Sequence, residues 1–173
     1  LIEEGYQVVG AFMKQWTDSG EVSGVCTWKE DRRDAIRVAS FLGIPLLTLD
    51  FEKEYKEMVM GYLFKEYALG RTPNPDVMCN KWIKFGFWLE KAKELGFDKI
   101  ATGHYANISL TQVNTCELTV AKDTEKDQTY FLHQLNQAQL WQTIFPLGNF
   151  TKDEVREVAR NIHIPTAEKD ESM

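Results

Sequence analysis

Apolar runs of strand length alternate with helical patterns along the first hundred residues, and this alternation constrains the fold more than any other feature. Residues 7–13 (QVVGAFM), 45–49 (PLLTL) and 99–102 are predicted to be buried strands. Between them, apolar residues recur at helical spacing over 35–42 and 55–63. Strands that alternate with helices predict an α/β fold with a mostly parallel sheet and helices on both faces.

Capping residues and helix breakers mark where these helices begin and end. Thr27 with Glu30 forms a capping-box pattern before the first helix, and Gly43 is a natural stop after it. Asp50 can cap the second helix, which we expect to end near Gly70.

The second half of the chain is expected to add a fourth strand and two further helices. The strand is predicted at 117–121, after a polar, turn-like segment at 109–115, and a helix follows at 137–145. Thr151 with Glu154 makes another capping box. The helix that it opens should bury four apolar residues, namely Val155, Val158, Ala159 and Ile162.

The stretch 70–105 (GRTPNPDVMCNKWIKFGFWLEKAKELGFDKIATGHY) concentrates the groups that are suited to chemistry. Pro73 and Pro75 restrict the backbone on either side of Asn74. The loop is therefore expected to be short and stiff, so that it can aim the side chains of Asn74 and Asp76.

Cys79 is predicted to lie near the N-terminus of a helix that runs from Asn80 to a stop at Gly96. The helix dipole and the neighbouring Lys81 and Lys84 would favour a thiolate over a thiol. A small buried cysteine beside a proline turn fits the same spacing. The sequence leaves both interpretations of Cys79 open.

Three signals lie at the carboxyl ends of predicted strands: Met13 ends the first, 102–104 end the third, and 122–128 follow the fourth. Because ligands of open α/β sheets bind at the carboxyl ends of strands, we expect these segments at one sheet edge. Gly103 would let a ligand approach the backbone closely. Taken alone, a glycine after a strand is more often a turn, and His104 is more often a hydrogen-bonded structural histidine.

The composition is that of an ordinary globular protein. The chain has 173 residues, of which 43% are hydrophobic, enough for one domain with a core. No apolar run approaches the roughly 20 residues of a membrane span, and the start of the chain does not resemble a signal peptide. The net charge of −6 argues against nucleic acid as a partner, although local patches decide. Cys26, Cys79 and Cys116 are too scattered for a disulfide framework or a zinc site.

The chain resembles the tRNA-specific 2-thiouridylases of the PP-loop ATP pyrophosphatase superfamily along nearly its whole length. The T-P-N-P-D-x-x-C-N block, from Thr72 to Asn80, is the most specific part, because other PP-loop enzymes lack it. The blocks that carry the resemblance are 12–14 with Trp16, 26–27 with 34–35, 42–45, 54–55, 70–76, 79–81, 83–85, 101–105, 126–128 with 130–132, and 145–148.

The resemblance implies ATP-dependent transfer of sulfur to C2 of the wobble uridine of tRNA, with Mg²⁺ expected beside the ATP. ATP would adenylate the uridine O2, and a cysteine persulfide would then supply the sulfur. Cys79 matches the family's nucleophilic cysteine, which ends in a disulfide, and Asp76 matches a general acid or base. The implied contacts are Asn74, Pro75 and Asp76 to the target base, the backbones of Met13 and Gly103 to ATP, and Lys126, Asp127 and Gln128 to tRNA.

The resemblance also implies an adenine nucleotide alpha hydrolase-like fold, parts of which lie outside this sequence. The first strand and its S-G-G-x-D-S phosphate loop are expected before Leu1, and the persulfide cysteine after Met173. We therefore expect residues 1–173 to form a single partial catalytic domain, without the family's tRNA-binding middle domain and C-terminal β-barrel. Such a fragment should be inactive alone.

The implied partners are tRNA and a cysteine desulfurase or sulfur-relay protein that donates the persulfide, with no membrane involved. The cytoplasm is the expected location, and the mitochondrion is the second choice. Two alternatives stay open: another PP-loop enzyme that adenylates a different substrate, and a truncated, non-catalytic nucleotide- or protein-binding module. For Lys126 and Asp127, an ion pair in a solvated loop is the simpler interpretation.

Overall fold

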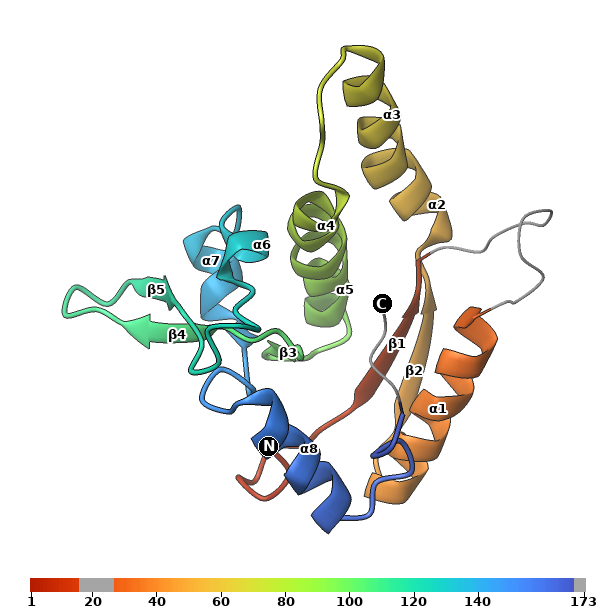
Figure 1. Ribbon diagram of the computed structural model, residues 1–173, viewed down its shortest axis with the longest axis vertical. Coiled ribbons are helices and arrows are strands. Elements are labelled where there is room, and N and C mark those ends of the chain that lie inside the picture. The colour runs from red at the N-terminus through yellow and green to blue at the C-terminus, as the bar shows by residue number, and fades with distance from the viewer. Residues whose placement is uncertain (16–26, 170–173) are drawn as a thin grey trace. The chain divides into compact units, whose positions relative to one another are not determined.

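The computed structural model describes residues 1–15 and 27–169, so Trp16 and Cys26 lie outside the described residues (Figure 1). The chain divides into two compact units. The first contains residues 1–55 and the segment from 156 onward, and the second contains residues 56–155. Each unit is described by itself.

The first unit is built on two parallel strands that a helix connects. β1 (Gly10–Lys14) pairs in parallel with β2 (Leu46–Asp50), and α1 (Thr27–Leu42) lies between them in the chain. The ladder begins opposite Leu46 because Pro45 has no N–H to donate, and its carbonyl accepts from the Gly10 amide at 2.9 Å. The α/β class with parallel strands is confirmed, and both strands start later than predicted.

Helix α1 ends where the sequence predicts. Its last residue precedes Gly43, which adopts the left-handed conformation with φ +67° that terminates helices. The side chain of Thr27 is outside the described part of the chain, so the capping box at this helix stays a prediction.

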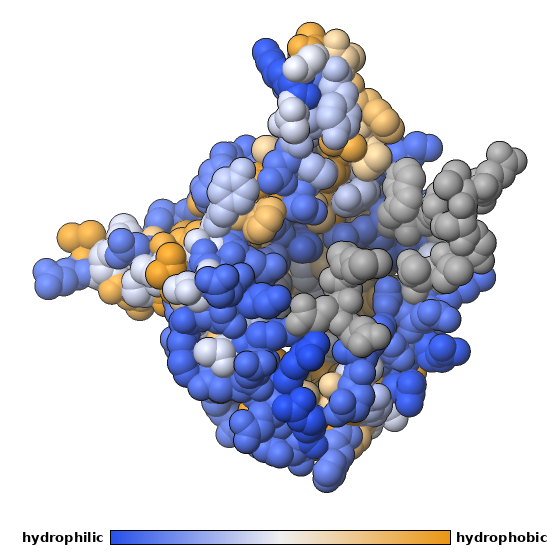
Figure 2. Space-filling model, viewed as in Figure 1, coloured by the Kyte–Doolittle hydropathy of each residue, from blue (hydrophilic) through white to orange (hydrophobic). Residues whose placement is uncertain are grey.

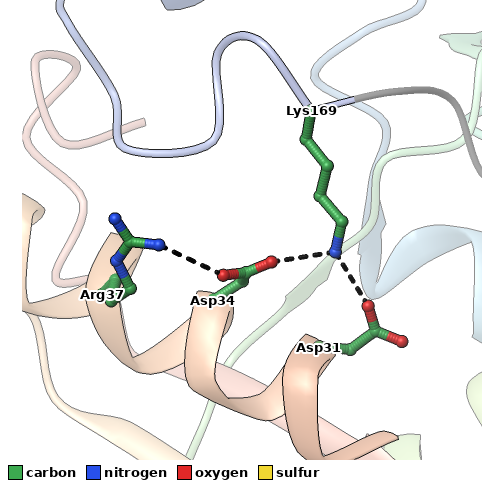
Figure 3. A network of polar contacts seen from close by, with 4 residues as sticks. All are labelled: Asp31, Asp34, Arg37 and Lys169. Atoms are coloured by element: carbon green, nitrogen blue, oxygen red, sulfur yellow. Dashed lines mark hydrogen bonds and ion pairs between the residues drawn. The ribbon is translucent and has the colours of Figure 1, made fainter. Parts of the chain in front are cut away.

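An ion-pair network joins the C-terminal segment of the first unit to α1 (Figure 3). Lys169 Nζ lies 2.9 Å from a carboxylate oxygen of Asp31 and of Asp34, and Asp34 lies 3.6 Å from Arg37. Hydrogen bonds to Asp34 and then Asp31 raise the pKa of Lys169, and the bond to Lys169 lowers the pKa of Asp34. Because the network is exposed to solvent, it adds little to the free energy of unfolding, and its main effect is to orient the C-terminal segment against α1.

The second predicted helix is present but not uniform. It consists of α2 (Glu52–Tyr55), the π-helical segment η1 (Lys56–Met60) and α3 (Gly61–Ala68). Asp50 Oδ1 accepts from the Glu52 amide at 3.1 Å, as the predicted capping role requires. The helix stops just before Gly70, whose φ is +70°.

The second unit contains a long helical stretch and a short pair of parallel strands. α4 (Pro75–Met78), the π-helical segment η2 (Cys79–Phe87) and α5 (Trp88–Glu94) follow one another without a break. β3 (Ile100–Ala101) pairs in parallel with β6 (Thr143–Ile144). The helical stretch has an apolar face: Phe85, Leu89 and Ala92 are buried, and Trp82 packs edge-on against Tyr62.

The sequence predicted an ordinary α-helix after Cys79, but this part of the helix is π-helical. Gly86 gives one physical reason, because a Cβ at this position would lie 2.8 Å from the carbonyl oxygen of Lys81. Gln139 Nε2 also donates to the carbonyl of Phe85 at 2.8 Å, so the local hydrogen bonding includes a partner from another helix. Single π-helical turns are rare and frequently occur at functional sites.

We expect Gly86→Ala to lower the free energy of unfolding by about 1–3 kcal/mol, since the added methyl group meets rigid backbone. Gly61→Ala is the matched control, because its Cβ would find only Lys56 O, at 3.8 Å. At Gly61 the new methyl group meets no close neighbour, and alanine favours a helix more than glycine does. The free energy of unfolding should therefore rise by about 0.5–1 kcal/mol. Denaturant unfolding followed by circular dichroism measures both, and changes of the same sign would contradict this account of Gly86.

The fourth predicted strand does not belong to a parallel sheet. β4 (Asn107–Leu110) and β5 (Cys116–Thr119) form an antiparallel hairpin, closed by Thr111 Oγ1 and Thr115 Oγ1 at 2.7 Å. A turn this short cannot contain a parallel crossover, which needs about a dozen residues or more. The segment 122–128 therefore follows a hairpin, and its predicted place at the end of a parallel strand was wrong.

The segment after the hairpin is divided more finely than predicted. Two short helices, α6 (Thr129–Leu132) and α7 (Gln137–Trp141), precede β6. The predicted helix 137–145 stops at Trp141 because the chain then pairs with β3. A two-residue strand has too few side chains for a periodic signal, so the sequence could not reveal it.

The capping box of α8 (Lys152–Asn161) is confirmed. The Glu154 amide donates to Thr151 Oγ1 at 3.3 Å, and the Thr151 amide donates to Glu154 Oε2 at 2.7 Å. The predicted burial was wrong for Val158 and Ile162, which are exposed. Figure 2 shows other apolar side chains on a mostly hydrophilic surface, over α3 and on the β4–β5 hairpin.

Candidate functional site

Helix α4 begins inside the proline motif, earlier than predicted. Asn74 is its N-cap, with Oδ1 accepting from the amides of Asp76 at 3.0 Å and Val77 at 3.1 Å. Pro75 occupies the first helical position, where a missing N–H costs nothing. The stiff loop therefore ends at Asn74, and the positive end of the helix dipole lies beside Asp76.

Cys79 follows one turn later and is buried, with 6% of its surface exposed. The predicted place of Cys79 at a helix N-terminus was wrong, because α4 begins at Pro75 and Cys79 follows its last residue. The helix dipole acts mainly within the first turn, so the thiolate form of Cys79 stays a prediction. Lys81 and Lys84 of the same π-helical segment are half-buried and supply the positive charge near it in sequence.

The carboxylate of Asp76 is exposed to solvent. Within the described ranges it forms no hydrogen bond or ion pair, because only its backbone groups are used in the helix. Residues three apart on a helix are neighbours, so Asp76 lies next to Cys79, about one turn closer to the helix N-terminus. An accessible carboxylate in this position can accept or donate a proton.

Gly103 and His104 follow β3 after one intervening residue, Thr102. Gly103 is exposed, and a Cβ added there would find only Leu147 Cδ1, at 3.8 Å, in ordinary contact. Nothing in the described protein therefore demands a glycine at this position for space. The backbone is open to an approaching ligand, which is what the sequence predicted for Gly103.

His104 is a structural histidine in a dry environment, as its simpler interpretation predicted. Its Nδ1 lies 2.8 Å from Thr102 Oγ1, and its ring packs between Phe85 and Phe145 at centroid distances of 5.7 and 6.0 Å. Burial lowers the pKa of His104 to about 4, with a smaller contribution from the positive charge of Lys84. The ring is therefore neutral at physiological pH.

In the predicted tRNA-contacting segment 126–128, one side chain is exposed to solvent and two form hydrogen bonds within the protein. Lys126 is exposed. Asp127 accepts from the Ala121 amide at 2.8 Å and from the Thr129 hydroxyl at 2.5 Å, which holds the loop closed. Gln128 Oε1 accepts from the Tyr105 amide at 3.0 Å. In the structure, Asp127 and Gln128 thus shape the segment from which Lys126 projects.

Most of the predicted site residues belong to one neighbourhood of the second unit. α4 packs against α6, and Asn80 Nδ2 donates to the Phe131 carbonyl at 3.2 Å. Gln128, just before α6, holds the backbone two residues after Gly103. Met13 lies on β1 of the first unit, half-buried, opposite Leu49 of β2.

Sequence reasoning missed Asn80 as part of this neighbourhood. Asn80 is 3% exposed, and its Oδ1 has no hydrogen-bond partner among the described residues. The signal was available, because an asparagine directly after the cysteine falls on the buried face of the helix. A buried acceptor of this kind is one that a ligand donor or a water molecule can satisfy.

The part of the chain that the structure describes contains no group of three or more His, Cys, Asp or Glu side chains that could hold a metal ion. The open backbone at Gly103 fits a nucleotide contact, and a Mg²⁺ ion would then be held mainly by the phosphates. None of the described helices is both long enough and apolar enough to span a membrane.

A family model described as "tRNA methyl transferase HUP domain" matches residues 1–173. Among curated relatives, "tRNA-specific 2-thiouridylase MnmA" of Listeria monocytogenes is 54% identical over 172 residues. The proteins of the same name from Enterococcus faecalis and Streptococcus pyogenes are each 51% identical over 172 residues. Each match covers 99% of this chain and 46% of the relative, so the chain spans about half the length of these relatives.

Proposed function

Because this chain belongs to the tRNA methyl transferase HUP-domain family, we propose that it is the catalytic core of an ATP-dependent sulfurtransferase that 2-thiolates the wobble uridine of tRNA. The names of its relatives support this activity. Since the chain spans 46% of those relatives, the proposal concerns the complete protein, in which residues 1–173 contribute a partial catalytic domain. We place that protein in the cytoplasm.

One observation carries the proposal: an exposed carboxylate without a partner in the described chain, one helical turn before a buried cysteine. Asp76 and Cys79 lie in a helix whose start is fixed by Asn74 and Pro75. The rigid start of the helix holds the two groups in one arrangement, which limits reorganisation when a substrate binds.

The residues take the following roles. Asn74 and Pro75 set the position of the target base against Asp76, which moves a proton to or from it. ATP, when bound against the open backbone of Gly103, would turn the uridine O2 into a leaving group. Cys79 then attacks the inner sulfur of a cysteine persulfide and forms a disulfide with that cysteine, while the outer sulfur bonds to C2 of the uridine and the activated O2 leaves with AMP. Because Cys79 is buried, the chemistry requires that substrate binding expose its sulfur.

Charge and partners complete the proposal. Lys126 is exposed at the surface of the second unit and can neutralise a tRNA phosphate. Asp127 and Gln128 support it by fixing the loop. The persulfide comes from a cysteine desulfurase or a sulfur-relay protein.

The test uses the complete protein, unmodified tRNA, ATP, and a cysteine desulfurase with cysteine, followed by mass spectrometry of the nucleosides. We expect 2-thiouridine that forms only with ATP, and none in a tRNA whose wobble base is cytidine. Adenylation of another substrate would favour a different PP-loop enzyme. Binding of ATP or tRNA without turnover would favour a non-catalytic module, and either result would contradict the proposal.

A further inference from the structure

Two segments that pack together in the second unit contain no acidic residue, although the whole chain has 26 acidic and 20 basic residues. These segments are 77–89, which includes η2, and 128–150, which includes α6 and α7. Hydrogen bonds from Asn80 to the Phe131 carbonyl and from Gln139 to the Phe85 carbonyl join them. Together they form a surface that contributes lysines and no carboxylate of its own, with Asp76 directly before its first residue, and such a surface is suited to a polyanion.

The cations of this surface are not neutralised by carboxylates. Lys81 Nζ donates to Gln134 Oε1 at 3.2 Å, a neutral acceptor. In the described part of the chain, neither Lys81 nor Lys84 forms an ion pair with a carboxylate. Both positive charges are therefore available to a ligand.

A directional chain of hydrogen bonds continues from Lys81 to the backbone carbonyl of Tyr130. The Gln134 amide, whose oxygen faces Lys81, donates through Nε2 to His133 Nε2 at 2.8 Å. His133 Nδ1 in turn donates to the carbonyl of Tyr130 at 2.6 Å. The chain fixes both the tautomer and the orientation of the His133 ring.

Tyr130 is exposed to solvent over 64% of its surface. The rings of His133 and Phe131 lie beside it, at centroid distances of 5.8 and 5.4 Å. An aromatic ring that its neighbours support and solvent reaches offers a face on which a nucleobase can stack.

We propose that Tyr130, supported by His133 and connected through Gln134 to Lys81, is a stacking platform for an unpaired base of an RNA loop. This inference rests on the proposed function and names a nucleotide that flanks the target base, because Lys81 is in the same π-helical segment as Cys79. Single-stranded RNA is favoured over an acidic protein because it supplies both phosphates for the lysines and a flat base for Tyr130.

The test measures binding of a fluorescent anticodon stem-loop RNA to the complete protein by anisotropy. Tyr130→Ala should weaken binding about tenfold, the loss expected for one stacked base, and Tyr130→Phe should bind as the unmodified protein does. Lys81→Gln should reduce the salt dependence of binding by about one charge. Tyr67→Ala is the matched control, because Tyr67 is an exposed tyrosine of the same unit whose position, on α3, is outside the acid-free segments.

Unchanged RNA affinity in Tyr130→Ala would overturn the platform, and so would an equal loss in Tyr130→Phe. Normal RNA binding by Tyr130→Ala, with weakened binding of the persulfide-donor protein, would assign the surface to that protein instead. If the unmodified protein forms 2-thiouridine while Tyr130→Ala has an unchanged KM for tRNA, only the platform fails. If the unmodified protein neither binds the RNA nor modifies tRNA, the proposed function fails as well.

Discussion

Cys79→Ala in the complete protein is expected to abolish ATP-dependent formation of 2-thiouridine without unfolding the chain. The substitution removes the only group at this position that can attack a persulfide sulfur. Asp76→Ala is expected to have a comparable effect, a loss of about 100- to 10,000-fold for a proton-transfer group. The measurement is the initial rate of 2-thiouridine formation, together with the thermal midpoint of each variant.

Two control substitutions distinguish the loss of a reacting group from a general effect of removing a buried cysteine or an exposed carboxylate. Cys116 is as buried as Cys79 but lies on β5, so Cys116→Ala should keep the rate. Asp98→Asn removes an exposed carboxylate outside the motif and should also keep it, whereas Asp76→Asn should be as inactive as Asp76→Ala. Unimpaired turnover in Cys79→Ala or Asp76→Ala would remove the role proposed for that residue.

Acidification from pH 6.5 to pH 4 is expected to cost the fold up to about 3 kcal/mol through His104 alone. Burial lowers the pKa of this histidine in the folded chain from 6.5 to about 4. Between these two values the unfolded chain binds more protons than the folded one. The contribution is therefore fully present above pH 6.5 and is lost as the pH falls toward 4.

The readout is the pH dependence of the free energy of unfolding, from urea titrations at several pH values. His104→Asn removes the titrating group and keeps an amide near Thr102. The free energy of unfolding should therefore change less between pH 6.5 and pH 4 than in the unmodified chain. His163→Asn is the control, because His163 is exposed and asparagine tolerates its φ of +54°; its slope should match the unmodified chain. An unchanged slope in His104→Asn would show that another group causes the acid sensitivity.

The residues of the candidate site were proposed from the sequence and their roles stay predictions, whereas the contacts that the structure shows for them were not predicted. The sequence identified Asp76, Cys79 and Gly103, since proline spacing and a glycine after a strand are local signals. It did not show that Asn74 is used as a helix cap, or that Asp127 and Gln128 close a loop. The partners of these side chains are backbone amides whose position depends on how the chain folds around them.

Local signals determined the helix ends and the parallel strands of this protein. Gly43 and Gly70 stop helices, and Thr151 with Glu154 starts one, because each interaction spans only a few residues. Tertiary structure decided the antiparallel β4–β5 hairpin, the two-residue strand β6 and the burial of Cys79. Each of these depends on which distant segment packs alongside, and hydrophobic periodicity marks a buried face without identifying its partner.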